Sequence, residues 1–444
     1  MTTPHRRIPG PAMSSTPPPL WDRRAVLAGG AALVGGFLAG CGANTGRDGG
    51  AGGAPARTAS ATGPNLSQWY HQYGEAGTLD AVRRYAADFK DAQISITWKP
   101  GDYDNAVAAA LQTDSAPDVF EYANGPTADM IVAGQVADLT DLIGPARTDL
   151  DPALLKRFTF QGKIWAIPQV IDLQVLVYRR SMLDKAEVLP PRTMDELVAA
   201  VDKLGTDKVK GLFLGNDGGA GLMGAPMLRS CGADLLTPDG KIAFDRPAAV
   251  SALAVLHRWY ADRKVLLGAP NDWFSPDAFT QGLTAMQFTG MWTLPQISKD
   301  IGDDFGVLPW PAMPGGKAHV PVGAYGACLR AKGAHLDVAK KYAAWLWLDS
   351  VDRQVEFATA YGLHVPARAA AVDKAERLRD GPAGEAVRLL RQYGVPQDHI
   401  LWTPACQSAF HDMMVRVVNK GADPAAELAA LKGPVAAELR RFPS

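Results

Sequence analysis

A short stretch of the sequence, Leu66 to Gly77, gathers residues that could bind or transform a polar ligand. It reads LSQWYHQYGEAG: a strand-like run leads into Tyr70, His71, Tyr73 and Glu75 before it reaches glycine. Aromatic faces pack on the C–H face of sugar rings, and carboxylates accept protons from hydroxyl groups. The same residue types could equally serve a catalytic centre or fill a core, so their position in the fold decides between these roles.

The elements around this stretch place it at the edge of an α/β sheet. Hydrophobic periodicity predicts strands near 66–70, 93–101 and 116–125, with helices near 78–90 and 103–113 between them. Such alternation is typical of an open α/β sheet, in which ligands bind at the carboxyl ends of the strands. Glu121 and Asn124 follow the third strand, so we expect them to face the residues after the first strand across one edge of a cleft.

The N-terminal region predicts export and attachment to a membrane. Arg23 and Arg24 precede an apolar stretch, Ala25 to Ala39, which is too short to span a bilayer and is typical of a signal peptide. The following Leu38-Ala39-Gly40-Cys41 resembles the lipobox of bacterial lipoproteins, which implies that residues 1–40 are a Tat-type signal and that Cys41 carries the lipid. A plain cleaved signal with a chance cysteine is the alternative. Residues 41–64, rich in Gly, Ala, Ser and Thr, predict a flexible tether.

Charge and composition narrow the function classes. The chain has 45 Lys and Arg against 46 Asp and Glu. It therefore has no excess of basic residues, which disfavours binding to nucleic acid. The eleven Trp and eleven Tyr often stand beside Gly, Pro or Asp, as sugar-binding loops require. The body from about residue 65 is too long for one core and predicts two lobes.

The cysteines and histidines give no sign of a metal site. Beyond Cys41, the remaining Cys231, Cys328 and Cys406 allow at most one disulfide, and three reduced thiols are an equal possibility. The eight histidines are scattered, so a metal-uptake protein is disfavoured. We expect neither a cofactor nor a metal.

Several blocks, taken in order, carry a resemblance that covers most of the chain. They are Pro117–Phe120, Gly134–Leu139, Gly162–Pro168, Pro190–Thr193, Gly282–Met286, Gly290–Trp292 and Gly362–Pro366. Together, behind a lipobox, they resemble the extracellular solute-binding proteins of carbohydrate-uptake ABC transporters, the maltose-binding-like family.

This resemblance implies a two-lobe, periplasmic-binding-protein-like (class II) α/β fold that closes on a ligand between its lobes. The implied N-lobe comprises 65–172 with 288–325, and the implied C-lobe comprises 173–287 with 326–444. Hinges are expected near Asp172, residues 286–289 and residues 325–328. The implied function is capture of a mono- or oligosaccharide and its delivery to the transmembrane subunits of an ABC permease, by a membrane-anchored monomer without bond-making chemistry.

The resemblance also implies further ligand-binding residues. Asp172 matches an acid of the first hinge, and Trp292 matches a ring used for stacking. Asp217 precedes two glycines, where a backbone could approach the ligand closely. The other candidates are Trp273, Tyr325, His364 and Trp402.

Three alternatives remain open. A secreted glycoside hydrolase would need two carboxylates across a cleft, which Glu75, Glu121 and Asp172 could supply. A solute-binding receptor could instead take a glycerophosphodiester or a polyol. An adhesin or signalling receptor could use the same fold without transport.

Overall fold

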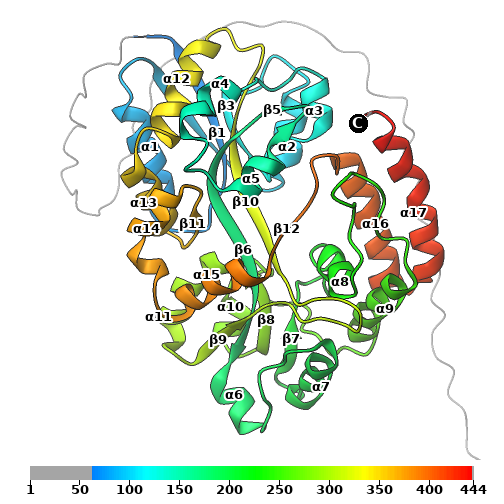
Figure 1. Cartoon of the computed structure of the whole chain (residues 1–444). Coiled ribbons are helices and arrows are strands. Elements are labelled where there is room, and N and C mark those ends of the chain that lie inside the picture. Colours follow the sequence, from blue (N-terminus) through cyan, green and yellow to red (C-terminus); the bar gives the residue numbers. More distant parts are fainter. Residues whose placement is uncertain (1–62, 443–444) are drawn as a thin grey trace, which may run out of the picture. The chain divides into compact units, whose positions relative to one another are not determined.

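The computed structural model describes residues 63–442 (Figure 1). The predicted signal peptide, Cys41 and nearly all of the predicted tether lie outside these residues. No helix within the described part is long and apolar enough to cross a membrane.

The helices and strands come in the following order. The first part contains β1 (Asn65–His71), α1 (Thr78–Asp88), β2 (Gln93–Lys99), α2 (Tyr103–Ala110), β3 (Val119–Ala123), α3 (Ala128–Val132), α4 (Thr140–Ile143), η1 (Gly144–Ala146), α5 (Pro152–Arg157), β4 (Thr159–Phe160), β5 (Lys163–Ile164), β6 (Ile167–Arg179), α6 (Arg180–Lys185), α7 (Met194–Leu204) and β7 (Lys210–Phe213). The second part contains α8 (Gly224–Ser230), α9 (Pro247–Ala261), α10 (Asp277–Thr280), β8 (Thr284–Gly290), η2 (Met291–Thr293), α11 (Leu294–Ile301), β9 (Phe305–Leu308), β10 (Val320–Leu329), α12 (Leu336–Trp347), α13 (Val351–Thr359), β11 (Val365–Pro366), α14 (Ala369–Lys374), η3 (Glu376–Leu378), α15 (Gly381–Tyr393), β12 (Gly394–Pro396), α16 (Pro404–Lys420) and α17 (Pro424–Leu439).

The predicted alternation of strands and helices at the start of the body is confirmed. β1 pairs in parallel with both β2 and β3, and α1 and α2 connect these strands. β10 then pairs antiparallel with β3 on one side and with β6 on the other. The carboxyl ends of β1, β2 and β3 therefore share one edge of the first sheet, because parallel strands point the same way.

The long strand β6 belongs to two sheets. Its first part, Ile167 to Leu173, pairs with β10, and its second part, Gln174 to Arg179, pairs with β8 and β9. The hinge expected near Asp172 falls inside this strand, which continues without a break from Ile167 to Arg179. Nearly every residue of β6 is buried, as in strands covered on both faces. Because the Asp172 side chain finds a buried partner in His364, this acid does not interrupt the strand.

Strand pairing and side-chain packing place some segments in a different lobe from the one predicted. The sequence assigns 288–325 to the N-lobe, whereas β9 and the end of β8 pair with the second part of β6. It assigns residues from 326 onward to the C-lobe, whereas α12 packs on the first sheet, where Tyr342 donates a hydrogen bond to Gln68 Oε1 (2.6 Å). We propose that the first lobe takes in 320–374 and that the second lobe takes in 174–308, with α16 and α17.

The chain passes between the two sheets at three places (Figure 1). The first is β6, and the second is the entry into β10 from Trp310, which packs against Phe288 in the second core. The third is the stretch from β12, which pairs with β10, to α16, which packs in the second core. The hinge expected at 286–289 is instead an internal part of the second sheet, because β8 pairs there with both β6 and β7.

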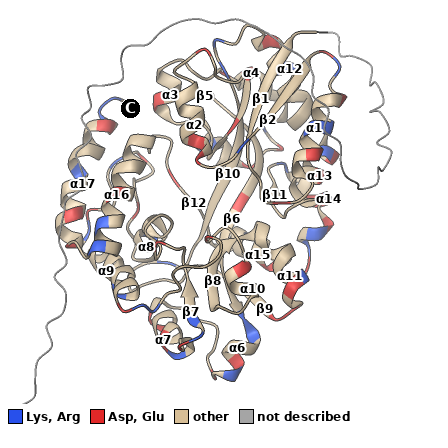
Figure 2. Ribbon diagram, turned by 180° about the vertical axis from the view of Figure 1, so that it is seen from behind, with Lys and Arg blue, Asp and Glu red and all other residues tan. Residues whose placement is uncertain are grey.

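The surface carries charges of both signs, and the described cysteines are unpaired. Figure 2 shows basic and acidic residues interspersed over the outer helices, with both signs present on α17. Cys231, Cys328 and Cys406 are all buried and free, so the described residues form no disulfide.

Candidate functional site

A cavity of about 660 Å³ lies between elements of the two sheets. One wall comes from the loop after β2 and the end of β3, and the other comes from the loop at Gly221, from Trp273 and from the start of α16. Gln174 on β6 and Pro321 on β10 line it between these walls. The cavity thus lies at the carboxyl ends of first-sheet strands, where α/β sheets bind ligands.

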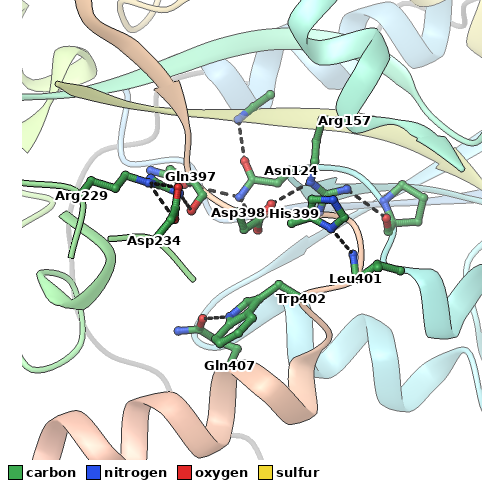
Figure 3. A network of polar contacts seen from close by, with 12 residues as sticks. Asn124, Arg157, Arg229, Asp234, Gln397, Asp398, His399, Leu401, Trp402 and Gln407 are labelled. Atoms are coloured by element: carbon green, nitrogen blue, oxygen red, sulfur yellow. Dashed lines mark hydrogen bonds and ion pairs between the residues drawn. The ribbon is translucent and has the colours of Figure 1, made fainter. Parts of the chain in front are cut away.

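Three of the predicted site residues line this cavity: Asn124, Trp273 and Trp402. Asn124 ends β3 with a positive φ of 58°, a conformation that asparagine tolerates better than most residues. Its amide donates to Asp398 Oδ2 (3.0 Å) and its carbonyl accepts from the backbone N–H of Ala324 (3.1 Å), as Figure 3 shows. The Trp402 indole donates to Gln407 Oε1 (2.8 Å), which fixes its ring beside the cavity (Figure 3).

The predicted stacking residue Trp292 supports Trp273 from behind. The two rings meet edge-to-face with centroids 5.9 Å apart, and only Trp273 is among the lining residues. The Trp292 indole donates to the carbonyl of Phe274 (3.0 Å). Its ring also covers Gly290, where a Cβ atom would lie 1.9 Å from the ring, so this close approach requires glycine.

Glu121 is the centre of a polar cluster that includes His71 at the end of β1, Tyr73 after β1, and Tyr325 on β10. The sequence places Glu121 after the third strand, whereas it lies within β3. This carboxylate is buried, and its Oε1 accepts from the backbone N–H of His71 (2.8 Å) and lies 2.5 Å from His71 Nδ1. Its Oε2 accepts from the Tyr73 hydroxyl (2.8 Å). The Tyr325 ring stacks on His71 at 4.4 Å, and burial raises the pKa of Tyr325 well above its usual value. These contacts join β1, β3 and β10 at one point.

Tyr70 does not belong to this cluster. It is fully buried in the first core, where its hydroxyl accepts from Gln68 Nε2 (2.7 Å). Successive side chains of a strand point to opposite faces, so Tyr70 and His71 cannot share one wall. The prediction that both line the ligand cleft is therefore corrected for Tyr70.

A second cluster holds His364 between two carboxylates. His364 Nδ1 contacts Asp172 Oδ1, and His364 Nε2 lies 3.2 Å from Glu75 Oε1. Although burial opposes the charge, the two acids raise the pKa of His364 to about 10, so the ring is an imidazolium at neutral pH. The other oxygen of Glu75, Oε2, is buried without a hydrogen-bond partner.

Strand geometry relates both clusters to the cavity. Asp172 lies two residues before Gln174 on β6, and Tyr325 lies four residues after Pro321 on β10, so each pair shares a face of its strand. Gln174 and Pro321 line the cavity. Both clusters therefore lie on the same face of β6 and β10 as the cavity, next to its lining residues.

Asp217 organises a loop of the cavity wall. Its two carboxylate oxygens accept from the backbone N–H groups of Gly219 (2.9 Å) and Gly221 (2.6 Å). Gly221 lines the cavity, whereas Asp217 is not among the lining residues. Asp217 thus positions backbone at the site.

Sequence reasoning missed the loop after β2 and the third crossing segment. The stretch GDYDN covers the end of this loop and the first turn of α2, and its Asp102, Asp104 and Asn105 line the cavity. Its signal was available, because these polar residues follow a predicted strand just as Glu121 and Asn124 do. Burial raises the pKa of Asp104 to about 7, and its Oδ1 has no hydrogen-bond partner.

The crossing segment ties both lobes together beside the cavity (Figure 3). Asp398 accepts from Arg157 Nε (2.7 Å) in the first lobe, and the carbonyl of Gln397 accepts from Arg229 Nη2 (2.7 Å) in the second. Arg229 also pairs with Asp234 (3.0 Å). Nothing in the local sequence signals the contacts of Asp398 with Arg157 and of Gln397 with Arg229, since the two partners lie 241 and 168 positions apart along the chain.

The described residues contain no group of His, Cys, Asp and Glu side chains arranged to hold a metal ion. The polar groups that line the cavity are carboxylates, amides, hydroxyls, the imidazole of His411 and one ion-paired arginine, which suit hydrogen bonding to a hydroxylated ligand.

The chain belongs to the family of bacterial extracellular solute-binding proteins, which it matches over residues 50–349. The family resemblance predicted from the sequence is thereby confirmed. The diacetylchitobiose-binding protein DasA of Streptomyces coelicolor is 28% identical over 235 residues, 49% of this chain and 52% of that protein. The melibiose/raffinose/stachyose-binding protein MelE of Bacillus subtilis is 30% identical over 139 residues, 30% of this chain and 31% of that protein. The chain spans about half of the first relative and less of the second.

Solved structures confirm the predicted two-lobe class II fold. An ABC transporter solute-binding protein from Thermotoga lettingae, bound with α-D-tagatose, matches with a TM-score of 0.73 at 19% identity, over 85% of this chain and 100% of that chain. The GacH receptor of Streptomyces glaucescens, solved unliganded and with acarbose, also matches with a TM-score of 0.73, at 22% identity over 86% and 100%.

Proposed function

We propose that this protein is the substrate-binding lipoprotein of an ABC importer, which captures a sugar between its lobes and delivers it to the permease. The observation that carries this proposal is the composition of the cavity. Two indoles, Trp273 and Trp402, come from the second lobe, while the first lobe contributes carboxylates and amides. Indole faces suit the C–H faces of a sugar, and the opposing oxygens suit its hydroxyls.

The charges of the lining argue against anionic ligands. No lysine lines the cavity, and its single arginine, Arg229, is already paired with Asp234. A phosphate group would therefore lose its hydration without gaining a free cation. This disfavours glycerophosphodiesters and phosphorylated sugars and leaves uncharged polyols as the second ligand class to test.

A hydrolase role is disfavoured by the surroundings of the three acids that could mimic a catalytic pair. Both oxygens of Glu121 accept hydrogen bonds, from His71 and from Tyr73. Asp172 and Glu75 share the imidazolium of His364. Groups held in this way are poor candidates for moving protons to and from a substrate.

A thermal-shift screen of the purified protein tests the proposed binding. Mono- and oligosaccharides, polyols and glycerophosphodiesters are compared at equal concentrations, because a ligand bound only by the folded state raises the melting temperature. We expect the rise with a sugar, and Trp273→Ala should lower the affinity for that sugar roughly ten- to a hundredfold. A rise only with a phosphodiester would overturn the sugar proposal.

The lipid anchor has a separate test. Lipidation of Cys41 would hold the protein at the outer face of the cell membrane, and Cys41→Ala should then move it from the membrane fraction to the soluble extracellular fraction. The measurement is an immunoblot of fractionated cells, with Cys231→Ala as the control for loss of a cysteine. Equal membrane retention of both variants would contradict the anchor.

A further inference from the structure

The charged groups around the cavity leave an excess of negative charge facing the ligand. Asp398 is balanced by Arg157, and Arg229 is balanced by Asp234. Asp102 and Asp104 line the cavity without a cationic partner. Asp102 instead caps α2 and accepts from the side chain of Asn105 (2.7 Å).

Asp104 is the unsatisfied member of this set. Its Oδ1 is buried and has no hydrogen-bond partner among the described residues. A backbone hydrogen bond from Ala123 reaches this carboxyl group, but burial of its unsatisfied Oδ1 is still costly, so a proton or a cation is needed to compensate the charge. At the opposite wall, Nη1 of Arg229 is also buried without a partner and can donate to an oxygen of the ligand.

Indole rings in the same cavity can contact both a cation and the C–H groups of a ring, so they favour a ring-shaped ligand that carries a positive charge. Trp273 presents an aromatic face that attracts a positive charge as well as C–H groups. A protonated amine on a sugar ring would donate a hydrogen bond to Asp104 and balance its charge. Ring and hydroxyl oxygens of the same sugar would face Arg229.

Resting on the sugar-binding function proposed above, we propose that the cavity selects amino sugars with a free, protonated amine over neutral and N-acetylated sugars. Asp104 is the residue that determines this specificity, through a charge-assisted hydrogen bond to the ammonium group. An acetamido group carries no charge and cannot replace that bond.

Isothermal titration calorimetry at pH 7 tests this specificity with matched probes. The probes are glucose, glucosamine and N-acetylglucosamine, together with the β-1,4-linked disaccharide of each. We expect the amino sugars to bind at least about tenfold more tightly than their neutral and acetylated counterparts, as one charge-assisted hydrogen bond would give. Asp104→Asn should remove that preference, so that the variant binds each amino sugar and its neutral counterpart with affinities within about threefold of one another. Asp141→Asn, which changes an exposed carboxylate, is the matched control.

The outcomes separate the two proposals. If the neutral or acetylated sugars bind as tightly as the amino sugars, or if Asp104→Asn keeps the preference, amino-sugar selectivity is overturned and sugar binding stands. If none of the probes binds while a non-sugar ligand from the thermal screen does, both proposals are overturned.

Discussion

At the scale of single residues, the imidazolium of His364 links the loop after β1 to the crossing strand β6. It joins Glu75, which follows β1, to Asp172 on β6. Two acids that would otherwise repel each other are thereby held within one cluster around a cationic ring. The pair His364 and Asp172 is separated by 192 positions in the sequence, so no local pattern could predict it.

This cluster predicts a fall in stability at alkaline pH. The folded-state pKa of His364 is raised from 6.5 to about 10, so its contribution is complete below about pH 6.5 and is lost as the pH rises through 10. His364→Gln should reduce the free energy of unfolding by about 3 kcal/mol at pH 7, since it leaves two acids uncompensated. It should also flatten the decline between pH 7 and 10, as measured by urea denaturation. His335→Gln, at an exposed histidine, is the control, and an unchanged pH profile in His364→Gln would contradict the assignment.

Substitution of Asp104 should change the stability in the opposite direction to substitution of His364. Its folded-state pKa is raised from 3.8 to about 7, so the group favours folding while protonated, and this contribution is lost as the pH rises from 3.8 to 7. Asp104→Asn should therefore raise the free energy of unfolding by about 2 kcal/mol at pH 8 and change it little at pH 4. Urea denaturation at the two pH values measures this. A variant less stable than the parent protein at pH 8 would show that the carboxylate has a stabilising partner.

At the scale of elements, the crossing segment between β12 and α16 carries contacts that stabilise the relation of the lobes. Its Asp398 pairs with Arg157, whose side chain is buried, and its Gln397 carbonyl accepts a hydrogen bond from Arg229. A buried guanidinium that loses its carboxylate pays a desolvation cost without compensation. Exposed ion pairs of this protein, such as Lys374 with Asp352, lack that burial.

Asp398→Ala should therefore lower the free energy of unfolding by about 3 kcal/mol. The matched change Asp352→Ala removes an equally close but exposed ion pair and should cost less than about 1 kcal/mol. Chemical denaturation of both variants gives the comparison. If both variants lose the same free energy of unfolding, burial of Arg157 does not determine how much this ion pair stabilises the protein.

The sequence predicts the order of helices and strands better than it predicts which of them pack together. The order of β1, α1, β2, α2 and β3 follows from hydrophobic periodicity alone, because local burial imposes that pattern. The continuity of β6 does not follow from it, since an acid inside an apolar run marks a break unless its distant partner is known. The loop after β2 could have been predicted by the same rule that placed Glu121, whereas Asp398 and Arg229 depend on contacts across the chain.

At the scale of the whole molecule, two lobes meet at a cavity whose walls come from both. A ligand that touches both walls favours the conformation in which they are close, by its difference in affinity for the two states. This is the mechanism that the family membership implies for capture of a solute. Trp273 and Trp402 on one side and Asp104 and Asn124 on the other are the groups through which such a ligand would act.

The strand β6 has a consequence for how the molecule melts. Its backbone hydrogen bonds with β10 and with β8 belong to a single run of thirteen residues. Unfolding of one sheet would therefore expose part of a strand that also belongs to the other sheet. Two bodies joined by a loose linker would melt independently, each with its own midpoint. This protein should instead give one calorimetric transition, with the β6 amides among the last to exchange with deuterium. Two separate transitions, or rapid exchange in the middle of β6, would show that the shared strand does not couple the lobes.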